Sequence, residues 1–342
     1  MEQPVEESSP LAGSTVLVTG GTGFTGSNLV RKLVDTEEVE VRGIARPSSE
    51  IDEDLAEAVT WYRGDVYDAE VVEEAVDGVN YVFHLAACFR DPAADDDEYR
   101  KVHVESTKLL AEAARAQPEF ERFVHTSTVG VHGHVKDPPA DETAPYNPAG
   151  DLYQETKLEG ELWIRDFAEE KGLPLAVIRP AAIMGPSDRR LLKLFKFAKY
   201  GFFPLLDGHN TRYHLIHVED LTDCMLLSAH HSDALGEVFI CGNAEPTSVV
   251  EILTQIGDML GRKVRFIHLP SRPLFILADL VEWISHRLGV EPILYRRRVD
   301  FFTKDRAFDT SKLRNTLDFS YRYDNEAGIR DTARGYMDRG WL

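Results

Sequence analysis

The sequence predicts an α/β protein in which a doubly wound parallel sheet carries helices on both faces. Three observations support this fold class: buried strand patterns, helical patterns between them, and their regular alternation. Short apolar runs rich in β-branched residues predict strands at residues 14–19, 39–44, 81–85, 122–126 and 175–179. Helical spacing appears at residues 28–34, 69–76, 104–116 and 152–170. Strands that alternate with helices form βαβ units, and right-handed crossovers arrange these units into such a sheet.

Composition limits the functions that the chain can have. Its formal net charge is −20 over 342 residues, and this acidic excess disfavours nucleic-acid binding because phosphates would repel it. Cys88, Cys224 and Cys241 are far apart in the sequence and form no CxxC pair, so we expect reduced thiols, a cytoplasmic location, no disulfide framework and no metal site. No apolar run reaches the roughly 18 residues that a membrane span needs. We therefore expect a small-molecule ligand.

A glycine-rich loop follows the first predicted strand. It reads TGGTGFTG, with Gly20, Gly23 and Gly26 at three-residue spacing. Gly20 permits a tight turn, Gly23 lets the backbone approach a pyrophosphate, and Gly26 lets the next helix pack close to the sheet. The pyrophosphate would lie beside Phe24 and Thr25, where free N–H groups at a helix N-terminus favour negative charge. A strand before the loop and a helix after it predict a dinucleotide-binding Rossmann domain; the alternative is a glycine-rich turn without a ligand.

Two later positions concern the adenosine half of the cofactor. Asp65, followed by Val66 just before a predicted helix, is either an acceptor for the adenine amino group or the N-cap of that helix. The second strand ends near Arg46, without the acid that usually binds a ribose 2′-hydroxyl. A guanidinium there suits a 2′-phosphate, so the sequence favours NADP over NAD. The alternative is an ordinary surface arginine.

The chain changes character after Pro180, where it becomes basic and aromatic and then less regular. An apolar run at residues 237–241 could return to the main sheet. We expect a disordered tail at residues 1–13, an NAD(P)-binding Rossmann domain at 14–185 with return elements around 213–243, and a smaller mixed substrate domain formed by 186–212 and 244–342.

Tyr153 and Lys157 are four residues apart on a predicted helix, so they share one face. A phenol has an ordinary pKa of about 10 and is a poor base at neutral pH. We expect the ammonium to lower this pKa, so that Tyr153 takes or gives the hydroxyl proton of a substrate. Lys157 can also hydrogen-bond the nicotinamide ribose. The alternative is a surface helix pair, but the position downstream of a nucleotide loop favours an acid–base pair.

Six motifs in this order resemble the extended short-chain dehydrogenase/reductase superfamily, which includes sugar-nucleotide epimerases and dehydratases, 3β-hydroxysteroid dehydrogenases and flavonol-type reductases. They are TGGTGFTG, RGDVYD, VFHLAA, HTSTVGVHG, YQETK and IRPAAIMGP. The resemblance covers residues 15–336. It implies a third catalytic group, a hydroxyl that hydrogen-bonds the reacting oxygen. Thr128 fits the spacing best and Ser127 is the second choice, although both hydroxyls could instead stabilise a turn.

The resemblance also implies residues around the nicotinamide. Ala86 and Ala87 would flank it, and Pro180 would line the pocket of its amide. One motif departs from the family pattern, in which Asn-Val-x-Gly-Thr precedes the fourth strand. Here His103 stands in place of the asparagine, as a substitute or as a structural residue.

Two features favour different substrates. A basic cluster could face the diphosphate of a nucleotide sugar or form a solvated face; it contains Arg189, Arg190, Lys193, Lys196 and Lys199. Arg212 lies about one residue from the position of a phosphate-binding arginine in sugar-nucleotide enzymes. Residues 274–288 predict a core-facing amphipathic helix, with an apolar wall or a membrane-surface contact as the alternative. Residues 302–313 resemble the 3β-hydroxysteroid dehydrogenase and hopanoid-associated epimerase-like branch.

We therefore expect hydride transfer between the nicotinamide and a secondary alcohol or ketone of a sterol-like or other alicyclic substrate. The alternatives are a sugar-nucleotide epimerase or dehydratase and a non-catalytic NAD(P)-sensing protein. A sensor needs no proton donor, so the complete set of tyrosine, lysine and threonine disfavours it. We also expect a homodimer, with peripheral contact as the only association with a membrane.

Overall fold

The computed structural model describes residues 9–36, 38–89, 94–135, 138–148, 151–208, 210–288 and 305–342. The predicted tail therefore lies outside the described residues as far as residue 8, and so do residues 302–304 of the branch-specific stretch. Leu11 is buried in the main core, and the N–H of Gly13 donates to the carbonyl oxygen of Glu38 at 2.7 Å. The chain thus joins the fold at Leu11, three residues earlier than predicted, because this side chain gains burial there.

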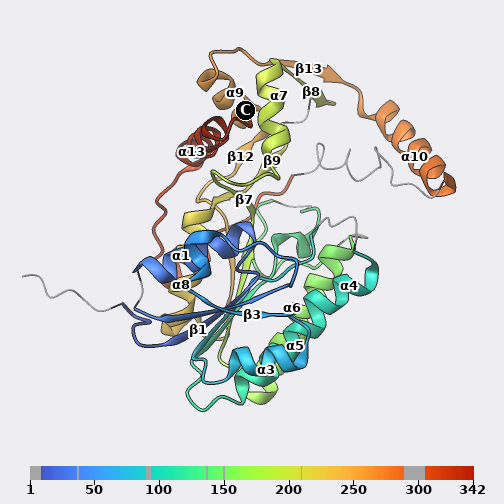
Figure 1. The fold of residues 1–342 in the computed structure, drawn as a ribbon. Coiled ribbons are helices and arrows are strands. Elements are labelled where there is room, and N and C mark those ends of the chain that lie inside the picture. The colour runs from blue at the N-terminus through green and yellow to red at the C-terminus, as the bar shows by residue number, and fades with distance from the viewer. Residues whose placement is uncertain are drawn as a thin grey trace, which may run out of the picture.

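A seven-stranded parallel sheet forms the centre of the protein, with strand order β11-β6-β5-β4-β1-β2-β3 (Figure 1). In chain order its strands are β1 (Thr15–Thr19), β2 (Glu40–Ala45), β3 (Thr60–Arg63), β4 (Tyr81–His84), β5 (Arg122–Thr126), β6 (Leu175–Pro180) and β11 (Val238–Cys241). The doubly wound fold class is confirmed, and β11 makes the predicted return beside β6. The direction of winding reverses between β1 and β4, and ligands of such sheets bind outside the carboxyl ends at this point.

Apolar clusters cover both faces of the sheet. Val16 and Val18 pack into the cluster with α1 (Phe24–Thr36) and α8 (Val218–His230). Leu17 points to the opposite face and packs into the cluster with three other helices. Those helices are α3 (Ala69–Val76), α5 (Ser106–Arg115) and α6 (Leu152–Lys171). The alternation along β1 therefore places helices on both faces, as the pattern predicts.

The predicted strand list omits β3. Its sequence is TWYR, its two end residues are exposed, and its two central residues are only partly buried. It is the edge strand of the sheet, so it does not need the apolar run that marks a strand buried on both faces.

The remaining elements form a smaller, less regular region that lies above the main sheet in Figure 1. Its helices are α7 (Leu192–Tyr200), α9 (Val249–Met259), α10 (Ser271–Leu288) and α13 (Asn325–Asp338). Its short sheets pair β7 (Ala182–Met184) with β10 (Leu215–His217), β8 (Phe202–Leu206) with β13 (Arg265–Leu269), and β9 (Arg212–Tyr213) with β12 (Thr247–Ser248). Short elements elsewhere are α2 (Glu53–Ala56), α4 (Asp96–Arg100), a π-helix (Lys101–Glu105), α12 (Ser311–Leu317) and 3-10 helices at Val129–His132 and Ser232–Ala234. A third apolar cluster joins α7, α9 and α13.

Helix α10 differs from the core-facing interpretation of its sequence. Ile276 is 70% exposed and Trp283 is 54% exposed, whereas the small residues Ala278 and Ser285 are buried. The helical spacing was predicted correctly, but the face turned toward the protein was not. Within the described residues, no helix combines the length and apolar character that crossing a membrane requires.

The cysteines also lie differently from what their sequence separation suggests. Cys224 on α8 and Cys241 on β11 are both fully buried, and their Sγ atoms are 2.7 Å apart. Both are free thiols, as is Cys88. In the described part of the chain, no group of three or more His, Cys, Asp or Glu side chains is arranged to hold a metal ion.

Candidate active site

The nucleotide loop connects β1 to α1. Gly20 has a φ of +70°, and a Cβ there would lie 2.8 Å from the backbone nitrogen of Ala86. A Cβ on Gly26 would lie 2.1 Å from the carbonyl oxygen of Gly20, so this position also excludes a side chain. A Cβ on Gly23 would approach just one described atom, the same carbonyl oxygen, at 3.3 Å. The loop is thus packed tightly at its two ends and open at Gly23, where a pyrophosphate would need the space.

The surroundings of Asp65 distinguish the two roles that the sequence allows for it, an acceptor for adenine or the N-cap of α3. The N-cap of α3 is Asp68, whose side chain accepts a hydrogen bond from the N–H of Glu70 at 3.1 Å. Asp65 is half-buried and does not cap the helix, so the structural alternative for its side chain is wrong. Its neighbour Val66 packs against the apolar cluster of α3 and α5.

Arg46 lies directly after β2 and is exposed. Its carbonyl oxygen accepts hydrogen bonds from the N–H of Ser49 at 2.9 Å and from Nη1 of Arg63 at 3.2 Å. No described residue hydrogen-bonds or ion-pairs with the Arg46 guanidinium. The backbone at this corner is therefore held while the guanidinium faces solvent.

Helix α6 begins at Leu152, and Asp151 caps it by accepting the N–H of Tyr153 at 3.2 Å. Lys157, one turn later, is 2% exposed. Its Nζ donates to the carbonyl oxygens of Thr126 at 3.0 Å and Ala86 at 3.4 Å. Burial lowers the pKa of Lys157 to about 8. The ammonium is thus held at the carboxyl end of β5, beside the loop that follows β4.

The pKa of Tyr153 is raised to about 12, and burial is the main cause. The charge of Arg190 and a side-chain hydrogen bond with Thr128 lower it, but by less than burial raises it. The expected lowering by Lys157 is therefore wrong for this state of the protein. Its ammonium bonds to backbone carbonyls, and the nearby positive charge that acts on the phenol comes from Arg190.

Thr128 and Ser127 have different surroundings. Thr128 opens a 3-10 turn, where its Oγ1 accepts the N–H of Gly130 at 3.0 Å, and it also hydrogen-bonds the side chain of Tyr153. Ser127 Oγ is buried and has no hydrogen-bond partner among the described residues. The geometry brings Thr128, the better match to the family spacing, to the phenol.

His103 is a part of the site that the sequence marked only as a departure from a pattern. It lies in the π-helix Lys101–Glu105, an irregularity that often occurs at functional sites. Its Nε2 accepts the N–H of Cys88 at 3.0 Å, so Nδ1 carries the proton that it donates to Oγ1 of Thr156 at 2.7 Å. Its ring centroid is 5.4 Å from that of Tyr153, and Phe89 flanks the phenol at 4.9 Å. His103 therefore joins the loop after β4 to the catalytic turn of α6.

The residues expected around the nicotinamide lie at the same edge of the sheet. Ala86 is buried between Gly20 and Lys157, whereas Ala87 is exposed. Pro180 ends β6 and is paired with Cys241 of β11. The structure places Ala86 at the junction of the nucleotide loop and the lysine.

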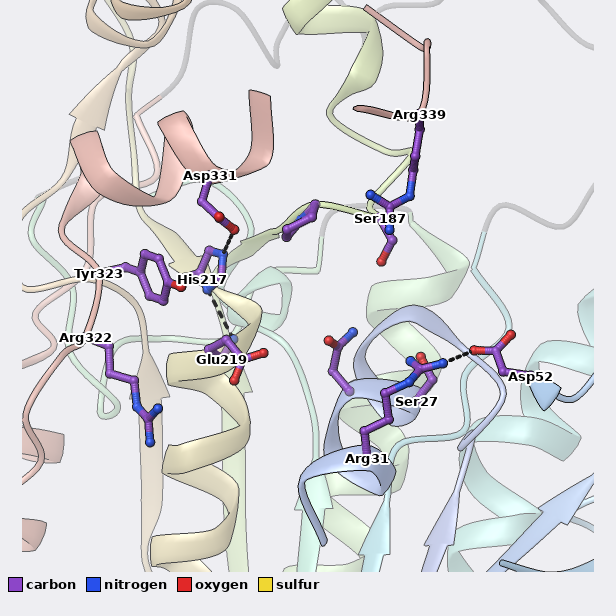
Figure 2. Close-up of a pocket in the computed structure, with 12 residues that line it drawn as sticks. Ser27, Arg31, Asp52, Ser187, His217, Glu219, Arg322, Tyr323, Asp331 and Arg339 are labelled. Carbon is purple, nitrogen blue, oxygen red and sulfur yellow. Dashed lines mark hydrogen bonds and ion pairs between the residues drawn. The ribbon is translucent and has the colours of Figure 1, made fainter. Parts of the chain in front are cut away.

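A cavity of about 610 Å³ lies beside α1, at the N-terminus of α8 and against α13 (Figure 2). The predicted catalytic and cofactor residues do not line it. Two of its arginines have acidic partners, since Arg31 pairs with Asp52 and Arg322 with Asp223. Nε2 of His217 lies 3.2 Å from Asp331. We assign this cavity no part in the chemistry at Tyr153.

The basic cluster divides into two parts. Arg190 is held by Asp188 at 2.6 Å, lies over the ring of Phe24 at 5.3 Å, and acts on the pKa of Tyr153. The three lysines of α7 are exposed, as expected for a solvated helix face. Arg212 is also exposed, with its Nε 3.9 Å from Asp305.

Comparison with known proteins identifies the family. Residues 16–242 match the model described as the NAD dependent epimerase/dehydratase family. The chain belongs to this family. It is therefore an NAD(P)-dependent enzyme of the extended short-chain dehydrogenase/reductase type, as the six motifs indicate.

Members of the epimerase/dehydratase family differ in substrate, and the relatives reflect this. The chain is 30% identical to a 3-beta-hydroxysteroid dehydrogenase of Mycolicibacterium neoaurum, over 94% of this chain and 91% of the relative. The crystal structure of gox2253 matches with a TM-score of 0.80 and 25% identity, over 96% of this chain and all of that one. The dTDP-glucose 4,6-dehydratase of Bacillus anthracis, in complex with NAD, has a TM-score of 0.73 and 20% identity, over 95% and 97% of the two chains, and shows the fold alone.

Proposed function

We propose that the enzyme transfers a hydride between a nicotinamide cofactor and a secondary alcohol or ketone of a sterol-like or other alicyclic substrate. The observation that carries the proposal is the arrangement at the carboxyl edge of the sheet. Tyr153 hydrogen-bonds Thr128, and Lys157 lies one helical turn away, buried beside Ala86. An oxygen placed against Tyr153 and Thr128 would have a proton donor and a second hydrogen-bonding hydroxyl.

The residues present fit a dinucleotide. The opening at Gly23 and the N-terminus of α1, with Phe24 and Thr25, would receive the pyrophosphate. Lys157 would hold the nicotinamide ribose, and the backbone at Ala86 would lie against the ring. When bound, the nicotinamide accepts or supplies the hydride.

The protein's own part in the reaction is the movement of a proton. With a pKa raised to about 12, Tyr153 is protonated at neutral pH, so it is ready to donate to a carbonyl oxygen during reduction. In oxidation it would take the hydroxyl proton, and the positive charge of Arg190 favours the phenolate that this requires. Thr128 would orient the reacting oxygen, and Ser127 remains the second choice. His103 would fix the position of α6.

For the cofactor we propose NADP, because the Arg46 guanidinium is exposed and pairs with no described residue. A 2′-phosphate there would receive charge-assisted hydrogen bonds that NAD cannot form. Asp65, which does not cap α3, would accept the adenine amino group. Related enzymes of this fold have been solved with NAD, so both cofactors belong in the test.

For the substrate, the 3-beta-hydroxysteroid dehydrogenase relative supports a sterol-like alicyclic alcohol, because the similarity extends over nearly the whole of both chains. Residues 186–212 and 244–342 would form the region that receives it. The solvent-facing Arg212 and the exposed lysines of α7 provide no described site for a nucleotide diphosphate. The sugar-nucleotide alternative is therefore the one to exclude by experiment.

The test compares Tyr153→Phe with the matched control Tyr62→Phe, a half-buried tyrosine on the far edge strand β3. Turnover is followed by nicotinamide absorbance with 3β-hydroxysteroids and their ketones, and UDP-sugar conversion is followed by chromatography. Tyr153→Phe should lower kcat by about 10²–10⁴-fold with an unchanged cofactor Kd, while the control keeps its rate. A Tyr153→Phe enzyme with half the wild-type rate would refute the assignment. Conversion of UDP-sugars, with no activity on steroids, would refute the substrate class.

A further inference from the structure

Exposed apolar side chains are unevenly distributed over the protein. Nine of the fourteen large hydrophobic residues exposed in the described part of the chain fall within residues 200–202 and 267–284. These segments belong to the end of α7, to β8 and β13, and to α10. Figure 1 shows this group at the end of the molecule away from the main sheet, with α10 outermost. Such a concentration of apolar surface indicates an interaction site.

Helix α10 presents its large side chains outward. Ile276, Leu277, Leu280, Trp283 and Ile284 are between 41% and 70% exposed, and their spacing of three and four residues puts them on one face. The opposite face contacts β8, where the buried Ala278 packs with Leu206, and Leu274 and Phe275 pack half-buried against this pair. A helix that only covered a protein core would have the reverse arrangement.

The same end of the molecule is basic, although the protein is acidic. Residues 192–208 and 262–288 contain eight lysine and arginine residues against three acidic residues, in a chain with a net charge of −20. All eight basic residues are exposed. They are Lys193, Lys196, Lys199, Arg262, Lys263, Arg265, Arg272 and Arg287. Apolar side chains with lysine and arginine around them are typical of helices that lie in the interface of an anionic bilayer.

We propose that this surface, formed by α7, β8, β13 and α10, docks on an anionic lipid bilayer, with α10 lying in the plane of the interface. Trp283 has the guanidinium of Arg287 4.3 Å from its ring centre. An indole ring and a long basic side chain suit the headgroup layer, because this layer is apolar on the side of the acyl chains and hydrated on the side of the solvent. The inference goes beyond the proposed function, because binding is measured without turnover and for any substrate.

A second copy of the chain is a weaker fit to this surface. In a two-fold symmetric dimer the same patch faces itself, so the two basic sets would lie opposite each other. Like charges placed opposite each other oppose association, whereas anionic headgroups attract them. The charge of the surface therefore distinguishes a bilayer from a self-association site.

The experiment is vesicle co-sedimentation of the full chain, with phosphatidylcholine vesicles that contain or lack phosphatidylglycerol. The wild type should sediment with the anionic vesicles, should be released from them at high salt, and should not bind vesicles of pure phosphatidylcholine. The triple variant Ile276→Ser, Leu280→Ser, Trp283→Ser should lose binding, while Leu235→Ser, also an exposed leucine, should keep it. Each of Lys263→Gln and Arg265→Gln should weaken binding by about fivefold.

Three results would overturn the proposal. These are no sedimentation of the wild type with anionic vesicles, equal sedimentation of the triple variant, and equal binding with and without phosphatidylglycerol. Analytical ultracentrifugation supplies the competing outcome. A wild-type dimer that the triple variant converts to a monomer, with no vesicle binding by either, would assign the surface to a second copy. Unchanged melting temperatures and unchanged cofactor binding would show that the variants are folded.

Discussion

Replacing the buried lysine of the site should stabilise the protein while it removes activity. The pKa of Lys157 is lowered to about 8 from an ordinary 10.5, because its ammonium is buried. At about 1.36 kcal/mol for each pH unit, this difference corresponds to about 3 kcal/mol by which the folded protein is destabilised when the lysine is charged. Lys157→Met removes the charge but also removes the hydrogen bonds to Ala86 and Thr126, worth about 1 kcal/mol each. We therefore expect a net gain of about 1–2 kcal/mol at pH 7.

The effect should depend on pH in a specific window. Between pH 8 and 10.5 the unfolded chain keeps the Lys157 proton while the folded protein has released it. The free energy of unfolding of the wild type should therefore rise through this window relative to Lys157→Met. The advantage of Lys157→Met should be largest below pH 8, and by pH 10 the wild type should be the more stable protein by about 1 kcal/mol.

The assay is urea unfolding of both proteins at pH 7 and pH 10, with thermal unfolding as a second measure. A gain of 1–2 kcal/mol corresponds to a rise in Tm of about 1–3 °C in a protein of 342 residues. Lys171→Met, at the exposed end of α6, is the control and should change stability by less than about 0.5 kcal/mol. The reasoning fails if Lys157→Met is less stable than the wild type at pH 7, or if the gap is the same at both pH values.

Three further substitutions test other parts of the structure. Gly23→Val should abolish cofactor binding in a fluorescence titration without unfolding the protein, because its side chain would enter the space open to the pyrophosphate; an unaltered titration contradicts this. Arg46→Ala should weaken NADP binding by about tenfold, or about 1.4 kcal/mol, and leave NAD binding nearly unchanged; equal losses for both cofactors would make Arg46 an ordinary surface residue. Arg179→Ala should destabilise the protein by about 3–5 kcal/mol in urea, since it leaves the fully buried Glu161 carboxylate with only the longer ion pair to Arg165 at 3.6 Å; a loss below 1 kcal/mol would show that this pair or water compensates.

The strands that sequence predicts well are those buried on both faces. Residues 122–126 are the clearest case, because the predicted and observed bounds of β5 agree, and its first four residues are buried. The edge strand β3 gives no such signal because solvent reaches both of its ends. The nucleotide loop is also predictable, since Gly20 and Gly26 are required by close backbone contacts, either within a few residues or just after the neighbouring strand β4.

The features that sequence could not predict depend on surroundings in three dimensions. The spacing of Tyr153 and Lys157 places them on a common helix face. It does not predict the phenol pKa, which burial raises and which Arg190, from a later segment of the chain, lowers by a smaller amount. Helical spacing in residues 274–288 does not say which face meets the protein. The role of His103 was equally hidden, because its partners Cys88 and Thr156 come from different elements.

Three buried histidines near Lys157 affect how stable the protein is in acid without affecting the pH dependence of its rate in the same range. Burial lowers the pKa of His84 to about 3 and that of His103 to about 2, and it lowers the pKa of His125 well below its ordinary range. None of the three titrates in the native protein between pH 5 and 7, so none can produce a break in a rate profile there. The unfolded chain does take up these protons below pH 6.5, at about 1.4 kcal/mol per histidine and pH unit. These three histidines should therefore contribute to the loss of activity in acid through cooperative unfolding, and not through a change in the rate of the folded enzyme.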